Sequence, residues 1–376
     1  MAQESTNPNN LKDTITRRGY HFVAIWAAGI LFLYAIFGYV GVRQLQGYKA
    51  ETEETRRAWL DSATTDSDAR ASDITIPPGA KGAEVRVGIY INRIGEFSVK
   101  EAGWTADFDI WFRWTGDGVR PGENFQVVNG QIARREKKAA YAGGGEQYER
   151  YRVKARITNY FDLSRFPFSD EALTIKVEDD IHGVEALRYV ADERGSGINR
   201  LGVPQNLQIV KSLATVKLHN YSSGRGDPRL SVGAEDIHSR FVFAMLGSPP
   251  SSSLFVMMFQ ALFASIAIAF IAFLIKPIHL DPRFGLGVGA FFAAIGNNIF
   301  VGTMLPQAER ITLAGMVNGI GLVTIFLTLV QSAISLYIFD TTGRTMLSRF
   351  FDKVSFAVFL IGYGVVTLML VFAARP

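Results

Sequence analysis

The chain has 376 residues, no cysteine and five histidines, and 48% of its residues are hydrophobic. The lack of cysteine excludes disulfide frameworks, thiolate zinc sites, iron–sulfur clusters and cysteine nucleophiles. A net charge of +4 is small for this length and gives no case for nucleic-acid binding, which needs a concentrated basic surface. The mean hydropathy of +0.14 lies between the values typical of soluble proteins and of membrane bundles, so we expect both kinds of segment.

Apolar residues gather in five runs that contain no Asp, Glu, Lys or Arg. The runs are Tyr20–Val42, Leu254–Ile275, Phe284–Ala308, Ile311–Phe339 and Val354–Ala374. A bilayer core about 30 Å thick needs roughly 20 helical residues to cross, and each run reaches that length. Helices satisfy their own backbone hydrogen bonds in lipid, so we expect five membrane-spanning helices, at about 20–42, 254–275, 284–305, 311–339 and 354–374. The first run is too long for the apolar part of a signal peptide, which favours an uncleaved anchor over a cleaved signal.

The basic residues near these runs predict how the chain is oriented. They lie before the first run, between the second and third, and between the fourth and fifth, as Arg17, Arg18, Lys276, His279, Arg283, Arg344, Arg349 and Lys353. If every run crosses the membrane, these segments share one side, and positive charge favours the cytoplasmic side. We therefore expect a multi-pass protein of the inner (cell) membrane. Residues 1–19 would be cytoplasmic, and residues 43–250 and the C-terminus would be periplasmic or extracellular.

The polar stretch between the first two runs divides into a spacer, 43–83, and a domain, 84–250. The spacer is rich in Ser, Thr and Asp before Pro77-Pro78-Gly79. In the domain the hydrophobic period changes to two, with apolar residues at every second position. This alternation is clearest in 85–91, 108–114, 151–157, 173–177 and 241–245. Many short half-buried strands separated by turns predict a β-sandwich, followed by a four-helix transmembrane bundle over 251–376.

No catalytic motif appears, so we expect no enzyme and no cofactor. Asp179 and Asp180, with His182 nearby, offer calcium ligands or paired carboxylates, but a solvated turn after a strand is the favoured interpretation. Trp111 lies on the polar face of its strand. Such an aromatic either meets a ligand or another surface, or is covered by a neighbouring loop, and the residues leave both open.

Three short motifs support a family resemblance. Phe166-Pro167-Phe168 resembles the Phe-Pro-Phe-Asp of a signature loop, with Ser169 in place of the Asp, and Trp114-Thr-Gly-Asp117 resembles a Trp-x-Asp motif with one extra residue. The stretch from Pro282-Arg283 to Leu305-Pro306 resembles a pore helix that begins after a basic residue and ends at Leu-Pro. Over residues 84–374 the chain resembles the pentameric ligand-gated ion channels, the Cys-loop receptor superfamily, in their cysteine-free prokaryotic form. The helix at 20–42 departs from that pattern and either packs outside the bundle or serves only for targeting.

The resemblance implies a homopentamer in which the third run lines a pore. Helical spacing places one set of residues on the pore face: Gly285, Gly289, Phe292, Gly296, Ile299 and Thr303. Phe292 and Ile299 would form the bulky apolar rings of a gate. The alternative is that the glycines serve close helix packing. Asp281 and Arg283 would set selectivity at the inner mouth, and we expect a weak preference for cations.

The resemblance also implies an agonist site between subunits. Trp111 and Arg113 would lie on one wall, and Asp179, His182 and Tyr221 on the other. Coupling to the pore would run through the residues near the membrane boundary, namely Phe166, Pro167, Phe168, Arg240 and Pro306. The expected partners are a second copy of the chain, membrane lipids, permeant ions and an unidentified small ligand, proton or divalent ion, with no nucleic acid. A non-conducting sensor or scaffold of the same fold is the alternative.

Overall fold

The computed structural model describes residues 15–60, 82–205, 207–221, 236–248, 251–305, 310–342 and 344–375. The chain divides into two units. A helical unit comprises the chain up to Lys49, the segment Leu163–Ser169 and the residues from Ser251 onward. A β unit comprises Ala50–Asp162 and Asp170–Pro250. Most of the predicted spacer, including Pro77 and Pro78, lies outside the described residues.

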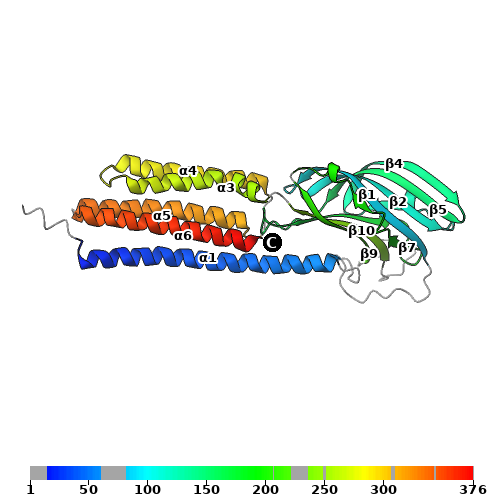
Figure 1. Cartoon of the computed structure of the whole chain (residues 1–376), viewed down its shortest axis with the longest axis horizontal. Coiled ribbons are helices and arrows are strands. Elements are labelled where there is room, and N and C mark those ends of the chain that lie inside the picture. Colours follow the sequence, from blue (N-terminus) through cyan, green and yellow to red (C-terminus); the bar gives the residue numbers. More distant parts are fainter. Residues whose placement is uncertain are drawn as a thin grey trace, which may run out of the picture. The chain divides into compact units, whose positions relative to one another are not determined.

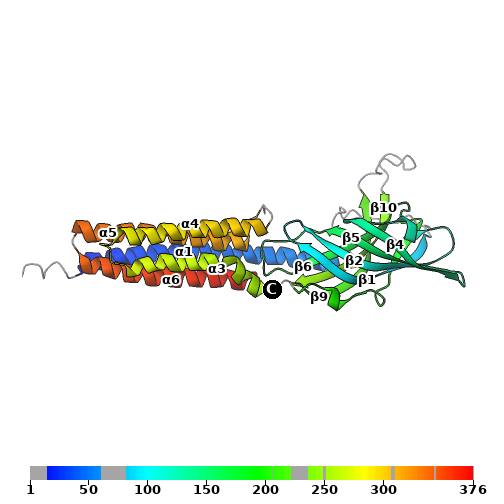
Figure 2. The same cartoon turned by 90° about the horizontal axis from the view of Figure 1, so that it is seen from above.

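The helical unit is built from long helices that run side by side (Figures 1 and 2). They are α1 (Arg17–Leu60), α3 (Ser251–Ile271), α4 (Leu280–Met304), α5 (Leu313–Thr342) and α6 (Thr345–Ala374). Among the described residues, five helices are long and apolar enough to cross a membrane, and they coincide with the five apolar runs. The chain is therefore a membrane protein.

Two of these helices begin or end well beyond the apolar runs. α1 continues from Val42 to Leu60, so the first part of the predicted spacer is helical. α6 begins at Thr345, so Arg349 and Lys353 lie within a helix and not in a connecting loop. Charged residues do not stop a helix that leaves the apolar part of a bilayer, because its backbone hydrogen bonds continue regardless.

α1 packs against α5 and α6 between Gly19 and Gly41. The Tyr34 hydroxyl lies 2.7 Å from the Thr324 hydroxyl of α5. The Tyr34 ring covers Gly362 of α6, where a Cβ atom would come within 2.4 Å of the ring. Nearer the start of α1, Val23 is buried with Ile338, Leu347 and Phe351 in one apolar cluster. The additional helix predicted at 20–42 is thus packed into the helical unit and is not a detached anchor.

The β unit contains two sheets. In the first, the order is β4 (Gly130–Gly143), β5 (Glu146–Thr158), β2 (Gly103–Thr115), β1 (Ala83–Ser98) and β7 (Leu187–Ala191), with β8 (Gly197–Ile198) also paired to β1. In the second, the order is β3 (Phe125–Val127), β6 (Glu171–Asp179), β10 (Asp236–Ser248) and β9 (Gln208–Tyr221). A single helical turn, α2 (Pro121–Asn124), precedes β3. All five predicted strands fall within these elements.

The two sheets share an apolar core. Phe112 of β2 lies 5.2 Å from Phe125 of β3, measured between ring centroids, and Phe125 lies 5.6 Å from Tyr151 of β5. Phe112, like Phe241 of the second sheet, is fully buried. These aromatic contacts join strands of both sheets, so the faces predicted to be apolar by alternation meet one another.

The contact between α1 and α6 predicts the effect of two neighbouring substitutions. Gly362→Ala should lower the melting temperature of the purified protein by several degrees, because overpacking against Tyr34 costs about 1–3 kcal/mol. Gly364→Ala is the matched control, since a Cβ at Gly364 meets nothing within 4 Å. Equal melting temperatures for the two variants would contradict the packing of α1 on α6.

Candidate functional site

α4 buries one stripe of residues and exposes the opposite one. The buried residues are Arg283, Gly287, Ala290, Ala294, Asn297 and Val301. They recur at intervals of three and four, so a single face of the helix packs on its neighbours α3 and α5. The residues predicted for the pore lie on the other side. Phe292 and Ile299 are 67% and 64% exposed, and Gly285, Gly289, Gly296 and Thr303 are also exposed.

The glycines of α4 divide in the same way. A Cβ at Gly287 would come within 2.3 Å of Leu329, so this glycine permits close packing on α5. At Gly285, Gly289 and Gly296 a Cβ would meet nothing within 4 Å in the described chain. Close packing within one chain therefore explains Gly287 but does not explain the three glycines assigned to the pore face.

The two selectivity candidates at the start of α4 have opposite surroundings. Asp281 is exposed. Arg283 is only 1% exposed, and its Nη1 and Nη2 atoms lie 3.1 and 2.7 Å from the two carboxylate oxygens of Asp352 on α6. Gln331 and Ser332 of α5 also accept hydrogen bonds from the guanidinium. The structure thus buries Arg283, which was predicted to act with Asp281 at the inner mouth, inside the helical unit.

The segment Leu163–Ser169 leaves the β strands and belongs to the helical unit. The Phe168 ring lies 5.5 Å from Phe255 of α3, and the backbone N–H of Leu313, the first residue of α5, donates to the Ser164 carbonyl at 2.8 Å. Phe166 and Phe168 are both buried. The predicted coupling motif, Phe166-Pro167-Phe168, is therefore part of a loop held among the ends of membrane helices.

The other two coupling candidates differ from this pattern. Arg240 of β10 is 1% exposed, and its Nε donates to Glu178 of β6 at 2.5 Å within the β unit. Tyr221 of β9 donates to the second oxygen of Glu178 at 2.7 Å. Arg240 is thus buried within the β unit, where it forms an ion pair with Glu178 across the second sheet. Pro306 lies outside the described residues.

Tyr221 is one of three ligand-site candidates that lie on β6, on β9 or in the turn after β6. Asp179 ends β6, and its Oδ1 accepts hydrogen bonds from the backbone N–H groups of Ile181 and His182. The His182 ring nitrogen Nδ1 lies 2.9 Å from the same oxygen. Asp179 is 1% exposed, so it caps a turn instead of standing in solvent, while Asp180 is exposed. No group of three metal-ligating side chains occurs among the described residues.

Burial changes the chemistry of this cluster. It raises the pKa of the Tyr221 phenol to about 12, and the hydrogen bond to Glu178 acts in the same direction. His219 and His238 stack edge-on against Tyr221, with ring centroids 4.4 and 5.5 Å away. Sequence reasoning missed His238, because strict alternation assigns it to the face opposite the apolar core. Its position two residues before Arg240 was the available signal.

The remaining candidates, Trp111 and Arg113, lie on β2. The Trp111 indole N–H donates to Asp192 at 3.1 Å, and its ring lies directly over Gly88 of β1. The structure thus supports the interpretation in which a neighbouring loop covers Trp111. Arg113 keeps 44% of its side chain exposed and lies 3.6 Å from Glu146.

Comparison with known proteins finds no matching family model and no curated relative of the chain. Inferences about its function therefore depend on its own residues and on the resemblance of their order to that of the pentameric channels.

The buried ion pair at the base of α4 predicts a large effect on stability. Asp352→Asn should destabilise the helical unit by about 3–5 kcal/mol, because it leaves the Arg283 charge buried without a counter-ion. Asp340→Asn on α5 removes an exposed carboxylate of the same kind and should change the melting temperature little. Replacing both members of the pair, as Arg283→Met with Asp352→Leu, should restore much of the loss. If Asp352→Asn melts like Asp340→Asn, the pair is not buried.

Proposed function

We propose that the chain forms a homopentameric ligand-gated ion channel of the inner membrane, with α4 as its pore helix. The observation that carries this proposal is the division of α4 into a packed face and an exposed face. The exposed face contains the glycines and the two bulky apolar residues that the channel resemblance assigns to the lumen. A helix face that stays exposed among the described residues is available to line a pore between several copies.

Five copies of this face around an axis would stack the same residue into rings. Rings of Gly285, Gly289 and Gly296 add no side-chain bulk, so the lumen is wide at those levels. Phe292 and Ile299 form the bulky apolar rings. A narrow apolar constriction excludes water and so blocks ions without a plug, which makes these two rings the proposed gate.

The surroundings of Arg283 support a preference for cations. Its guanidinium is engaged by Asp352, so it does not offset the charge of Asp281 at the mouth. Five exposed Asp281 carboxylates then form an acidic ring, as in other cation-selective pores. The basic loops favour placing this mouth on the cytoplasmic side, with the β unit outside.

We place the agonist site between neighbouring β units. His182 and Tyr221 contribute from one subunit, with buried Asp179 holding the His182 ring, and Arg113 of β2 contributes from the next. Trp111 supports its own strand through Asp192 and is not assigned to ligand contact. Whether the agonist is a small molecule, a proton or a divalent ion, it must bind the open state more tightly than the closed state, because only differential affinity shifts a two-state equilibrium.

Coupling runs through segments that join strands and membrane helices. The loop Leu163–Ser169 connects β5 to β6 along the chain and packs on α3 and α5. α1 adds a second link. The guanidinium of Arg310, which lies between α4 and α5 along the chain, stacks over the ring of Tyr48 on α1, 5.7 Å from the ring centroid. One turn later Thr52 donates to Asp162, the residue just before the loop, at 2.6 Å. The extra helix is therefore proposed to take part in gating.

The gate is tested by removing one ring. Phe292→Ala should give a constitutive leak in planar bilayers, because the apolar constriction becomes wider and hydrated. Phe300→Ala removes the same side chain from another exposed position of α4, 43% exposed, and should leave the closed state intact.

The result also separates the two candidate functions. A closed Phe292→Ala channel would contradict this gate, and particles without five subunits in class averages would contradict the architecture. Absence of current in every variant of pentameric particles would favour the non-conducting sensor.

Selectivity is tested in the leaking background. Asp281→Asn combined with Phe292→Ala should move the reversal potential in asymmetric KCl towards zero, because it removes the acidic ring. The control, Asp340→Asn in the same background, should leave the reversal potential unchanged. A chloride-selective leak before the Asp281 substitution would contradict the proposed cation preference.

A further inference from the structure

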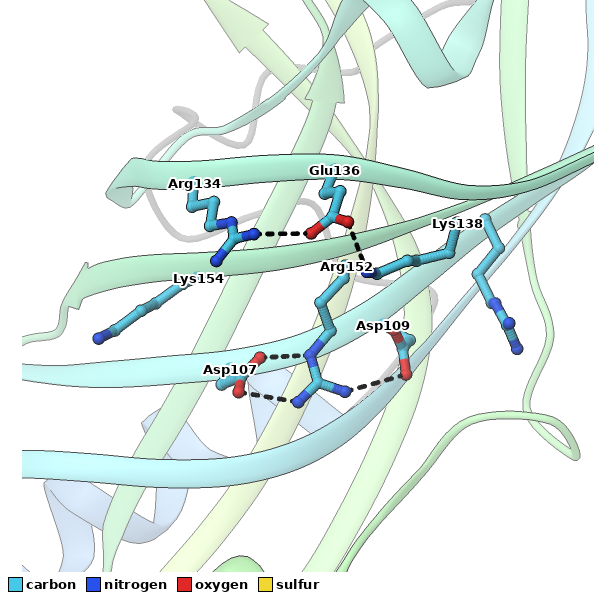
Figure 3. Close-up of a pocket in the computed structure, with 8 residues that line it drawn as sticks. Asp107, Asp109, Arg134, Glu136, Lys138, Arg152 and Lys154 are labelled. Atoms are coloured by element: carbon cyan, nitrogen blue, oxygen red, sulfur yellow. Dashed lines mark hydrogen bonds and ion pairs between the residues drawn. The ribbon is translucent and has the colours of Figure 1, made fainter.

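The outer face of the first sheet carries a pocket of about 540 Å³ that is lined entirely by charged side chains (Figure 3). Its lining comes from β2, β4 and β5: Asp107, Asp109, Arg134, Glu136, Lys138, Arg150, Arg152 and Lys154. A volume of this size suits a small molecule. Five cations and three carboxylates leave the pocket with an excess of positive charge.

Every carboxylate of the pocket already has a cationic partner. Arg152 donates to both oxygens of Asp107, at 2.6 and 2.8 Å, and lies 3.5 Å from Asp109. The hydrogen bonds to Asp107 raise the pKa of Arg152 above its usual value. Arg134 and Lys138 converge on Glu136, at 3.0 and 2.6 Å (Figure 3). The acids therefore orient three of the cations.

The side chains of the other two cations, Lys154 and Arg150, form no ion pair or hydrogen bond among the residues that the structure describes. Lys154 lies opposite Asp107 in the β2–β5 register, yet both oxygens of Asp107 are taken by Arg152. On its other side Lys154 lies opposite Arg134. Like charges directly opposite one another destabilise a sheet, so this position lowers stability unless an anion compensates.

We propose that the pocket binds an elongated anionic small molecule that carries an oxyanion group at each end. Arg150 and Lys154 are four residues apart on one strand face, about 14 Å along the backbone, and Arg152 lies between them. One anionic end would meet Lys154 and Arg134, and the other would meet Arg150 and Lys138. The Arg152 guanidinium, fixed by Asp107, would face the middle. A metal cation does not fit this surface, because its three carboxylates already pair with Arg or Lys side chains.

The site does not depend on channel activity, so it is tested by binding alone. The purified full-length protein in neutral detergent is titrated calorimetrically, at fixed ionic strength, with tripolyphosphate, with octanedioate and with orthophosphate. At least one of the two elongated anions should bind, with one site per chain, more tightly than orthophosphate. The better probe distinguishes a phosphorylated ligand from a carboxylated one.

Substitutions locate the site. Lys154→Gln and Arg150→Gln should each weaken binding several-fold, and together about tenfold or more, because each removes a charge-assisted contact. Arg156→Gln is the matched control, since it removes the next cation on the same face of β5, which already pairs with Glu101. Binding by neither elongated anion, or an equal loss in Arg156→Gln, would overturn the proposal. So would unchanged binding by a folded double variant.

Discussion

The structure depends on one constraint, namely that α4 buries one of its two faces and leaves the other exposed in the described chain. Its small and polar buried residues, such as Gly287 and Asn297, allow α3 and α5 to approach closely. Side chains on the other face, among them Phe292 and Ile299, remain largely exposed in the part of the chain that the structure describes. We propose that several copies associate around that face and thereby create a pore.

The base of α4 is held by charge in the same unit. Arg283 is fixed on α6 by Asp352 and on α5 by Gln331 and Ser332, so three helices meet at one guanidinium. A buried pair of this kind contributes orientation more than stability, since desolvation offsets much of its attraction. It leaves Asp281 as the exposed charge at that end of the helix. The proposed selectivity and the packing of the helical unit therefore have a common origin.

Patterns of short range predicted most of the fold. The period of two located β1, β2, β5, β6 and β10 but not the other strands. The apolar runs located the five helices, and helical spacing identified the face of α4 that carries Phe292. Helical spacing could also have predicted that Arg283 is buried, because Arg283 precedes buried Gly287 and Ala290 by four and seven residues. Its partner, Asp352, was not predictable, since it lies far along the chain in a region taken for a loop. The hydrogen bond from Trp111 to Asp192 likewise joins residues far apart in the sequence, so no local pattern predicts it.

The central claim is that one face of α4 lines an aqueous path, and the absence of native cysteine permits a direct measurement. Single cysteines are introduced by Gly296→Cys, Ile299→Cys and Thr303→Cys, with Ala294→Cys and Phe300→Cys for the buried and the other exposed directions. The rate of modification by a charged, membrane-impermeant methanethiosulfonate reagent is then measured in liposomes. The account predicts fast modification at 296, 299 and 303 and slow modification at 294 and 300. Equal rates at all five positions, or fastest modification at 300, would contradict it.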